Sequence, residues 1–305
     1  MADLSVKLAN ITLKNPLIAA SGTYGFGRDY EALYPLSALG GISTKGTTLH
    51  KRLGNPPPRI AETPSGMLNS VGLQNPGVAH FLKYELPNLE KQDVVILANI
   101  AGATADECAE ACAMLEGSAV HMIELNISCP NVKEGGAAFG ASCESAAAVT
   151  KAVRKATTKP LMVKLSPNVT DITAIARAVE AEGADAVSLI NTLLGMRIDI
   201  RTRRPILRNN VGGMSGPAVF PIAVRMVWQV ANAVHIPVVG MGGIASWEDA
   251  VEMLLAGASA LQIGSAMFAN PKAPLEILAG LEKYLDDHQI SSVAELTGKV
   301  EPWKA

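Results

Sequence analysis

The sequence has few cysteines, no excess of either charge and no long hydrophobic run. With 26 Lys and Arg against 28 Asp and Glu, its formal net charge of −2 gives no support to a nucleic-acid partner, which usually needs a concentrated basic face. Four cysteines in 305 residues do not make a disulfide framework, and their spacing suits neither an iron–sulfur cluster nor another metal. Cys108 and Cys112, one helical turn apart, are expected to pack as small hydrophobes.

Signals for membrane insertion and export are also missing from the sequence. No stretch reaches the roughly 18 uninterrupted apolar residues that span a bilayer. The first residues, Met-Ala-Asp-Leu-Ser-Val-Lys, lack the basic start and apolar core of a signal peptide. We therefore expect a cytoplasmic protein with no membrane partner, folded as one domain over residues 1–305.

Short apolar runs alternate with longer amphipathic segments from end to end. Most runs are nearly continuous Val, Ile, Leu and Ala, as expected of parallel strands that are covered on both faces. Eight strands, each followed by a helix or a long connection, predict a (β/α)8 TIM barrel of the α/β class, with a doubly wound open sheet as the alternative. The expected strands are residues 17–20, 41–45, 94–100, 121–128, 161–166, 186–192, 237–242 and 260–264.

The segments between these runs predict helix starts and two hairpins. Residues 104–107 and 246–249 have the pattern of helix capping boxes. Residues 4–14 alternate around a turn and predict an N-terminal β-hairpin that closes the bottom of the barrel. Residues 197–213 carry five arginines and predict a hairpin inserted after the sixth strand, which is either a solvated excursion or a lid or subunit contact.

Reactive groups are concentrated where the fourth expected strand ends. The apolar run at residues 121–125 leads into Asn-Ile-Ser-Cys-Pro-Asn at 126–131, and a glycine-rich loop follows at 135–140. A barrel collects its active site at the carboxyl ends of its strands. Cys129 can act there as a base or nucleophile, because forming a thiolate at pH 7 costs only about 2 kcal/mol from an ordinary pKa of about 8.5.

Other strand ends add polar groups to the same rim. Lys164 lies inside an apolar strand, and since an ammonium buried without a counter-charge is costly, we expect it to face a bound anion. The glycine turns at residues 240–245 and 263–265 are expected to grip the phosphate of a mononucleotide, or else only to permit tight strand-to-helix turns. Residues 63–77 have little helical or strand period, which predicts a long functional loop that reaches a substrate.

Together these residues resemble the class 1 dihydroorotate dehydrogenases over essentially the whole chain. The matches are the cysteine motif at 126–131, Lys45, the loop at 63–77, residues 163–165 and 189–192, and the two glycine turns. The sequence of this loop is similar to that of the 1B subgroup. The resemblance implies a barrel with one flavin mononucleotide (FMN) per chain. It also implies a homodimer core within a heterotetramer, whose second subunit carries FAD and a [2Fe-2S] cluster and passes electrons to NAD.

The resemblance further implies a reaction, the oxidation of dihydroorotate to orotate in the de novo synthesis of the pyrimidine nucleotide UMP. Cys129 would remove the C5 proton while a hydride passes from C6 to FMN. The substrate would be held by Lys45, Asn69, Ser70, Val71, Gly72, Leu73, Asn126, Asn131, Asn191 and Thr192. The cofactor would be bound by Ser21, Lys45, Gly46, Asn99, Asn126, Lys164, Ile190, Gly216, Gly242, Gly243, Gly264 and Ser265.

Three alternative functions stay open at the level of sequence. The first is a fumarate-dependent dihydroorotate dehydrogenase, a homodimer of the 1A type. The second is a related flavin barrel that acts on other dihydropyrimidines. The third is a phosphate-binding isomerase or aldolase barrel that uses Lys164 as a base or as a Schiff-base former.

Overall fold

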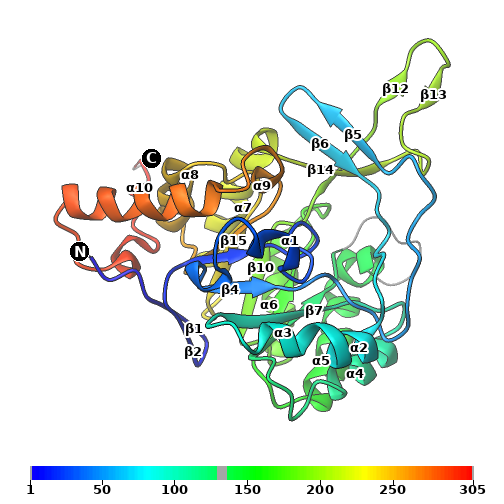
Figure 1. Ribbon diagram of the computed structural model, residues 1–305, viewed down its shortest axis with the longest axis horizontal. Coiled ribbons are helices and arrows are strands. Elements are labelled where there is room, and N and C mark those ends of the chain that lie inside the picture. The colour runs from blue at the N-terminus through cyan, green and yellow to red at the C-terminus, as the bar shows by residue number, and fades with distance from the viewer. Residues whose placement is uncertain (1, 129–135, 304–305) are drawn as a thin grey trace.

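The computed structural model describes residues 2–128 and 136–303, and within these ranges eight parallel strands close into a barrel (Figure 1). The strands follow one another around the barrel in chain order, and the last pairs with the first through Gln262 and Ile18. This confirms the predicted (β/α)8 barrel, with every strand inside its expected range, and excludes the open sheet. The strands are β3 (Leu17–Ala19), β4 (Gly41–Ser43), β7 (Val95–Ile100), β8 (Met122–Asn126), β9 (Leu161–Lys164), β10 (Ala186–Leu189), β15 (Val238–Met241) and β16 (Ala260–Ile263).

Helices between the strands form the outer layer of the barrel. The longer ones are α4 (Ala105–Ala113), α5 (Cys143–Ala156), α6 (Ile172–Ala181), α7 (Phe220–Ala231), α8 (Trp247–Leu255) and α10 (Ala273–Asp287). The shorter ones are α1 (Arg28–Glu31), α2 (Val78–His80), α3 (Leu86–Leu89) and α9 (Ala266–Ala269). Single turns, η1 (Leu36–Ala38), η2 (Phe81–Glu85), η3 (Gly136–Ala141), η4 (Pro217–Val219) and η5 (Val293–Leu296), complete the helical segments.

Helix α6 shows how the sequence specifies this layer. The side chain of Asp171 accepts hydrogen bonds from the backbone amides of Thr173 and Ala174, which would otherwise be unpaired at the first turn. An apolar stripe with helical spacing then packs against the barrel, because burying it removes apolar surface from water. The stripe consists of Ile172, Ile175, Ala176 and Val179, all of them buried.

Of the two predicted capping boxes, one is complete. The hydroxyl of Ser246 accepts from the backbone amide of Asp249, and the Asp249 carboxylate accepts from the amide of Ser246. At the start of α4, Thr104 accepts from the amide of Glu107 in the same way. The Glu107 carboxylate, however, accepts from the amide of Ala103, one residue before the expected position, so the reciprocal half of that box is not formed.

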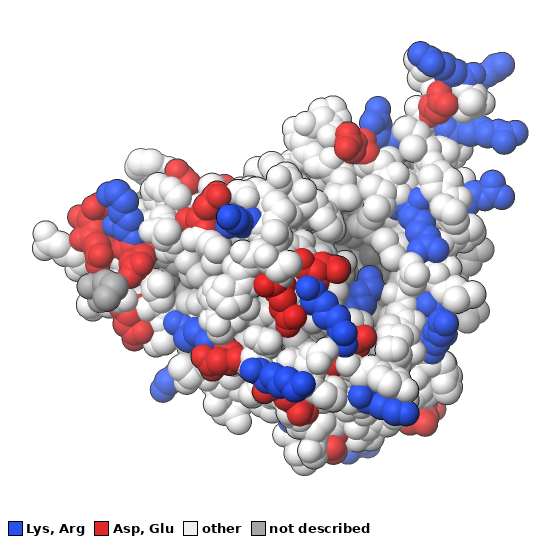
Figure 2. Space-filling view, viewed as in Figure 1, with Lys and Arg blue, Asp and Glu red and all other residues white. Residues whose placement is uncertain are grey.

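Both predicted hairpins are present. Strands β1 (Val6–Leu8) and β2 (Ile11–Leu13) are antiparallel. Lys14, which follows β2, forms an ion pair at 2.6 Å with Asp93, which precedes β7. This hairpin therefore lies at the amino ends of the barrel strands. Strands β12 (Ile198–Asp199) and β13 (Arg204–Pro205) form the inserted hairpin. It projects from the body at the upper right of Figure 1, and the Lys and Arg side chains at its tip stand out in Figure 2.

The expectation of a long structureless loop at residues 63–77 is partly wrong. Its first part belongs to a hairpin, β5 (Ile60–Thr63) and β6 (Gly66–Asn69), and β6 pairs with β14 (Gly212–Ser215), which pairs with β11 (Leu193–Gly195). The four strands form a second sheet beyond the barrel. Periodicity could not reveal it, because each strand has only three or four residues and the pairing of β6 with β14 joins segments more than 140 positions apart in the chain.

Within the described ranges, no helix is both long and apolar enough to cross a bilayer. The largest hydrophobic cluster fills the barrel interior and the space between the barrel and its helices. A small separate cluster, Ala61, Leu68 and Leu207, stabilises the second sheet. The barrel therefore provides a rigid floor, and the second sheet adds a wall above one side of it.

Candidate functional site

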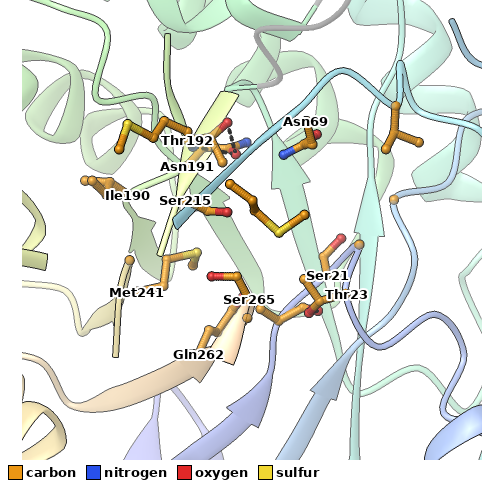
Figure 3. A pocket seen from close by; sticks show the side chains of 18 of the residues that line it. Ser21, Thr23, Asn69, Ile190, Asn191, Thr192, Ser215, Met241, Gln262 and Ser265 are labelled. Atoms are coloured by element: carbon orange, nitrogen blue, oxygen red, sulfur yellow. Dashed lines mark hydrogen bonds between the residues drawn. The ribbon is translucent and has the colours of Figure 1, made fainter. Parts of the chain in front are cut away.

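A cleft opens between the carboxyl ends of the barrel strands and the second sheet. It holds about 1260 Å³ of space, part of which is open solvent at its mouth. A hollow is visible right of centre in Figure 2, below the projecting hairpins. In Figure 3, Asn69, Asn191 and Thr192 lie along the upper part of the cleft, and Ser21, Gln262 and Ser265 lie along the lower part.

The structure brings together most of the site residues that the sequence suggested. Those that line the cleft are Ser21, Lys45, Gly46, Asn69, Val71, Gly72, Leu73, Asn126, Lys164, Ile190, Asn191, Thr192, Gly242, Gly243, Gly264 and Ser265. Cys129 and Asn131 lie outside the described residues. Strand β8, which precedes them in the chain, ends at the cleft, since Asn126 is both its last residue and part of the lining.

Three suggested residues lie behind the lining. Ser70 is buried, and its hydroxyl and carbonyl oxygens accept hydrogen bonds from Asn55. Asn99 is fully buried below Asn126. Gly216 faces Gly66, whose Cα would lie 2.5 Å from a Cβ at position 216, so Gly216 allows the end of β14 to approach the start of β6 closely within the second sheet.

Two side-chain amides of the cleft, those of Asn191 and Asn126, belong to one directed chain of hydrogen bonds. Asn191 Nδ2 donates to Ser128 Oγ at 2.8 Å, and Ser128 Oγ donates to Asn126 Oδ1 at 2.8 Å. Asn126 Nδ2 then donates to Asn99 Oδ1, and Asn99 Nδ2 donates to Glu124 Oε2 at 2.6 Å. Because a carboxylate only accepts hydrogen bonds, this end of the chain fixes which way each amide points.

Glu124 receives further donors from around the barrel interior. Its oxygens accept hydrogen bonds from Ser43 on β4, from Ser188 on β10 at 2.8 Å and from Gln262 on β16 at 2.7 Å, in addition to Asn99 on β7. The side chain is 0% exposed. Side chains from four other strands thus converge on one carboxylate beneath the floor of the cleft. This convergence could not be predicted from the sequence, because Glu124 interrupts an otherwise apolar strand and its partners are scattered over 220 residues.

The expectation for Lys164 is corrected in one respect, because the barrel itself supplies a counter-charge. Burial alone would raise the pKa of the Glu124 carboxyl group, but the Lys164 ammonium and the donors Ser43, Asn99 and Gln262 outweigh it and hold that pKa below its usual value. Lys164 is 5% exposed and lines the cleft, whereas Glu124 does not. The sequence pattern therefore placed Lys164 correctly at the cleft but did not reveal Glu124 as its counter-charge.

The sequence-based site omits several apolar residues of the cleft and the polar residues Thr23, Ser215 and Gln262. Met67, Met214, Met241 and Phe268 line it, and they come from the second sheet, from β15 and from α9. Gln262 lines the floor, and its Oε1 atom is buried with no hydrogen-bond donor among the described residues. An unsatisfied acceptor in a cleft is a group to which a ligand can donate.

No cysteine among the described residues lines the cleft. Cys108 and Cys112 lie on the buried face of α4 as expected, and burial raises the pKa of Cys108 to about 12. No cluster of three or more His, Cys, Asp or Glu side chains in these ranges is suited to hold a metal ion. The cleft is thus lined by amides, hydroxyls, two lysines and apolar groups.

Comparison with known proteins identifies the family to which this chain belongs. The family model for dihydroorotate dehydrogenase matches residues 3–285. The chain belongs to the dihydroorotate dehydrogenase family. The relatives include the dihydroorotate dehydrogenase B (NAD(+)) catalytic subunits of Bacteroides thetaiotaomicron, 55% identical over 99% of this chain and 100% of that protein, and of Porphyromonas gingivalis, 56% identical over 95% of each. The resemblance to the 1B subgroup is thereby confirmed.

A solved structure extends the likeness at the level of fold. The crystal structure of the family's enzyme from Eimeria tenella in complex with ferulenol superimposes with a TM-score of 0.80, covering 97% of this chain and 88% of that one. The sequences are 22% identical, so this likeness shows the common barrel alone.

Proposed function

We propose that this chain is the catalytic subunit of an NAD-dependent dihydroorotate dehydrogenase, which oxidises dihydroorotate to orotate in pyrimidine synthesis. The observation that carries the proposal is the full-length identity of 53–56% to subunits of that name. The cleft supports it independently, because four side-chain amides, two lysines and several hydroxyls suit a flat anionic ring rich in hydrogen-bonding groups.

The residues of the cleft fit FMN as the cofactor. The unsatisfied Oε1 of Gln262 and the Lys164 side chain on the floor offer an acceptor and a positive charge to the polar edge of a flavin ring. The glycine turn at residues 242–243 and the Gly264–Ser265 pair lie on the same cleft, where their backbone amides can hold a phosphate. When bound, FMN supplies the two-electron acceptor that no side chain provides.

We assign the remaining cleft residues to the substrate and its proton. Lys45, Asn69, Asn126, Asn191 and Thr192 would hold the carboxylate and ring amides of dihydroorotate, with backbone contacts from residues 71–73. Cys129 and Asn131, on the segment that follows β8, would complete the set. Cys129 would accept the C5 proton, which lies beside a carbonyl group and is therefore acidified.

We also propose that the electrons leave through a second protein. A subunit carrying FAD and a [2Fe-2S] cluster would reoxidise the flavin and reduce NAD in the cytoplasm, with two copies of each subunit in the assembly. The words "catalytic subunit" in the names of the relatives support a partner. The whole chain would then serve as one FMN-binding domain, residues 1–305.

A visible spectrum tests the central assignment. The purified protein is expected to be yellow, with flavin absorbance at about 450 nm. Anaerobic addition of dihydroorotate should remove this absorbance, because it reduces the flavin. A colourless protein that binds no added FMN would favour the isomerase or aldolase alternative. Bleaching by dihydrouracil but not by dihydroorotate would favour the other dihydropyrimidine-oxidising barrel.

The electron acceptor is tested separately. The chain alone should reduce neither NAD nor fumarate at a substantial rate with dihydroorotate, and NAD reduction should appear when the partner subunit is added. Rapid fumarate turnover by the isolated chain would contradict the 1B assignment and support a 1A-type enzyme. The same preparation, examined by analytical ultracentrifugation, gives the number of copies in the assembly.

A further inference from the structure

Glu124 and Lys164 occupy the same small region of the barrel interior. They lie on the adjacent strands β8 and β9, where Lys164 is the register partner of Asn126, two positions beyond Glu124. Ser188 on β10 is the register partner of Lys164 from the other side, and its hydroxyl donates to Glu124 Oε1 at 2.8 Å. Ser188 therefore lies next to both charged residues.

These two side chains are the charged groups that the described part of the chain buries. The described residues form no ion pair with Lys164, so its charge is balanced through the barrel interior and not by a direct contact. Glu124 in turn has four donors on its oxygens, which is how a carboxylate stays ionised away from water. Its lowered pKa agrees with an ionised state at neutral pH.

The position of each charge relative to the cleft is different. Lys164 lines the floor, whereas Glu124 lies beneath the lining and cannot touch a ligand. A flavin carries more negative charge after two-electron reduction than before it. A buried positive charge beside it therefore stabilises the reduced form, and a buried negative charge at slightly greater depth opposes this effect.

We propose that Glu124 is a positioning residue that balances the charge of Lys164 beneath the cofactor and thereby lowers the reduction potential of the bound flavin. The inference rests on the proposed function, since it concerns FMN in this cleft. It assigns a role to a side chain that makes no contact with substrate or cofactor.

The variant Glu124→Gln removes the charge with little change of shape. The new amide can keep its oxygen toward Asn99 Nδ2 and place its nitrogen where Gln262 and Ser188 now donate. The Ser188 hydroxyl can rotate to accept from the new nitrogen, and Gln262 can accept from it by turning its own amide over, which presents the Gln262 nitrogen instead of Oε1 to the cleft. The network can therefore be satisfied without the charge.

The potential of bound FMN, measured by equilibration with a reference dye, is the deciding quantity. In Glu124→Gln the ratio of reduced to oxidised flavin at a fixed potential should rise about tenfold, which for a two-electron couple corresponds to about 30 mV. A rise of threefold or more supports the proposal. A smaller change, or a change toward the oxidised form, overturns it.

Three further variants separate charge from structure. Ser188→Ala removes one hydrogen bond from Glu124 but no charge, and should shift the ratio less than threefold. Lys164→Gln should shift it toward the oxidised form. The double variant Glu124→Gln with Lys164→Gln, which restores the charge balance, should return to within threefold of the wild type. A double variant that keeps either single shift would contradict the proposed balance.

Failure of the inference can be distinguished from failure of the proposed function. The dissociation constant of FMN is measured first, by adding FMN to the cofactor-free wild-type protein and following its fluorescence. If the wild type binds no FMN, the proposed function is wrong. If it binds FMN and the Glu124→Gln protein, with a thermal unfolding curve like that of the wild type, keeps the wild-type potential, only the role of Glu124 is wrong.

Discussion

The side-chain amide of Gln262, on the last barrel strand, donates a 2.7 Å hydrogen bond to the carboxylate of Glu124 on the fourth. The bond crosses the barrel interior, and the two residues are 138 positions apart in the sequence. Strands that share no edge are therefore joined through their side chains. A barrel floor built in this way depends on polar contacts as well as on apolar packing.

Replacing Gln262 with methionine should destabilise the protein. The substitution keeps the side-chain volume but leaves Glu124 Oε1 with Ser188 as its remaining donor. We expect the free energy of unfolding, measured in urea without cofactor, to fall by about 1–3 kcal/mol. The matched control is Gln229→Met on the surface of α7, which loses a bond from Arg225 and should change stability by less than about 0.5 kcal/mol. Equal effects of the two variants would contradict the role given to Gln262.

Cys129→Ala should leave FMN bound and slow its reduction. A general base typically contributes 10²-fold or more, so anaerobic reduction by dihydroorotate, followed by stopped flow at 450 nm, is expected to slow by at least about 10²-fold. Cys143→Ala, which removes an exposed cysteine at the start of α5, is the control and should reduce at the wild-type rate. Near-normal reduction in Cys129→Ala would exclude Cys129 as the base.

Gly213→Ala should weaken the binding of orotate. A Cβ at position 213 would lie 1.9 Å from Thr192 Oγ1, so the added methyl group pushes on a residue of the cleft wall, in a strand whose register partner is Asn69 of the same wall. We expect the dissociation constant of orotate, measured by titrating the flavin spectrum, to increase at least about tenfold, which corresponds to about 1.4 kcal/mol.

The control for this variant is Gly195→Ala in the same sheet. There the added Cβ meets the flexible end of Leu68 at 3.0 Å and lies in ordinary van der Waals contact with Met214 Cβ at 3.8 Å. Orotate binding should change less than about threefold, or 0.65 kcal/mol. If both variants lose orotate affinity equally, the second sheet is sensitive to any added volume, and the specific contact with Thr192 is not responsible.

The stability of the fold should fall as the pH is lowered from 7.5 to 5.5, in part through His121. Burial and the nearby Lys159 ammonium lower the pKa of His121, and its Nδ1 atom accepts a hydrogen bond from the backbone amide of Ile96. The unfolded chain therefore binds a proton more readily than the folded protein. The contribution of His121 is fully present above about pH 6.5 and is lost as the pH falls toward the lowered folded value.

The variant His121→Asn isolates this effect. Asparagine can offer Oδ1 to the amide of Ile96 but does not titrate, so its free energy of unfolding should decrease less between pH 7.5 and pH 5.5 than that of the wild type. Urea unfolding at both pH values gives the two differences. A decrease as large as that of the wild type would mean that other groups dominate this range.

The barrel could be predicted from the sequence because its strands are self-evident apolar runs with helices between them. Residues 161–164 and 260–263, for example, are buried on both faces and read as continuous strands before any partner is known. Candidate site residues could be located for the same reason, because a polar residue such as Asn126 at the end of such a run must lie on the rim.

The second sheet and the Glu124 network could not be predicted in this way. Strand β14 consists of Gly-Gly-Met-Ser, which has little strand propensity, and its partner β6 is known only once the chain has folded. Glu124 and Gln262 each look like an isolated polar residue inside an apolar strand. Their importance lies in a contact across the barrel, and a single sequence carries no record of such contacts.

The pairing of β16 with β3 has a consequence for how the protein is made. While the chain emerges from the ribosome, β3 has an unprotected edge until residues 260–263 are released, and so has each last strand in turn. Only then can Gln262 donate its hydrogen bond to Glu124. Until that point the Glu124 carboxylate lies in a partly assembled barrel interior without this donor. Nascent chains stalled before residue 260 should therefore be the forms that need chaperones most, because they combine open strand edges with an incompletely solvated acid.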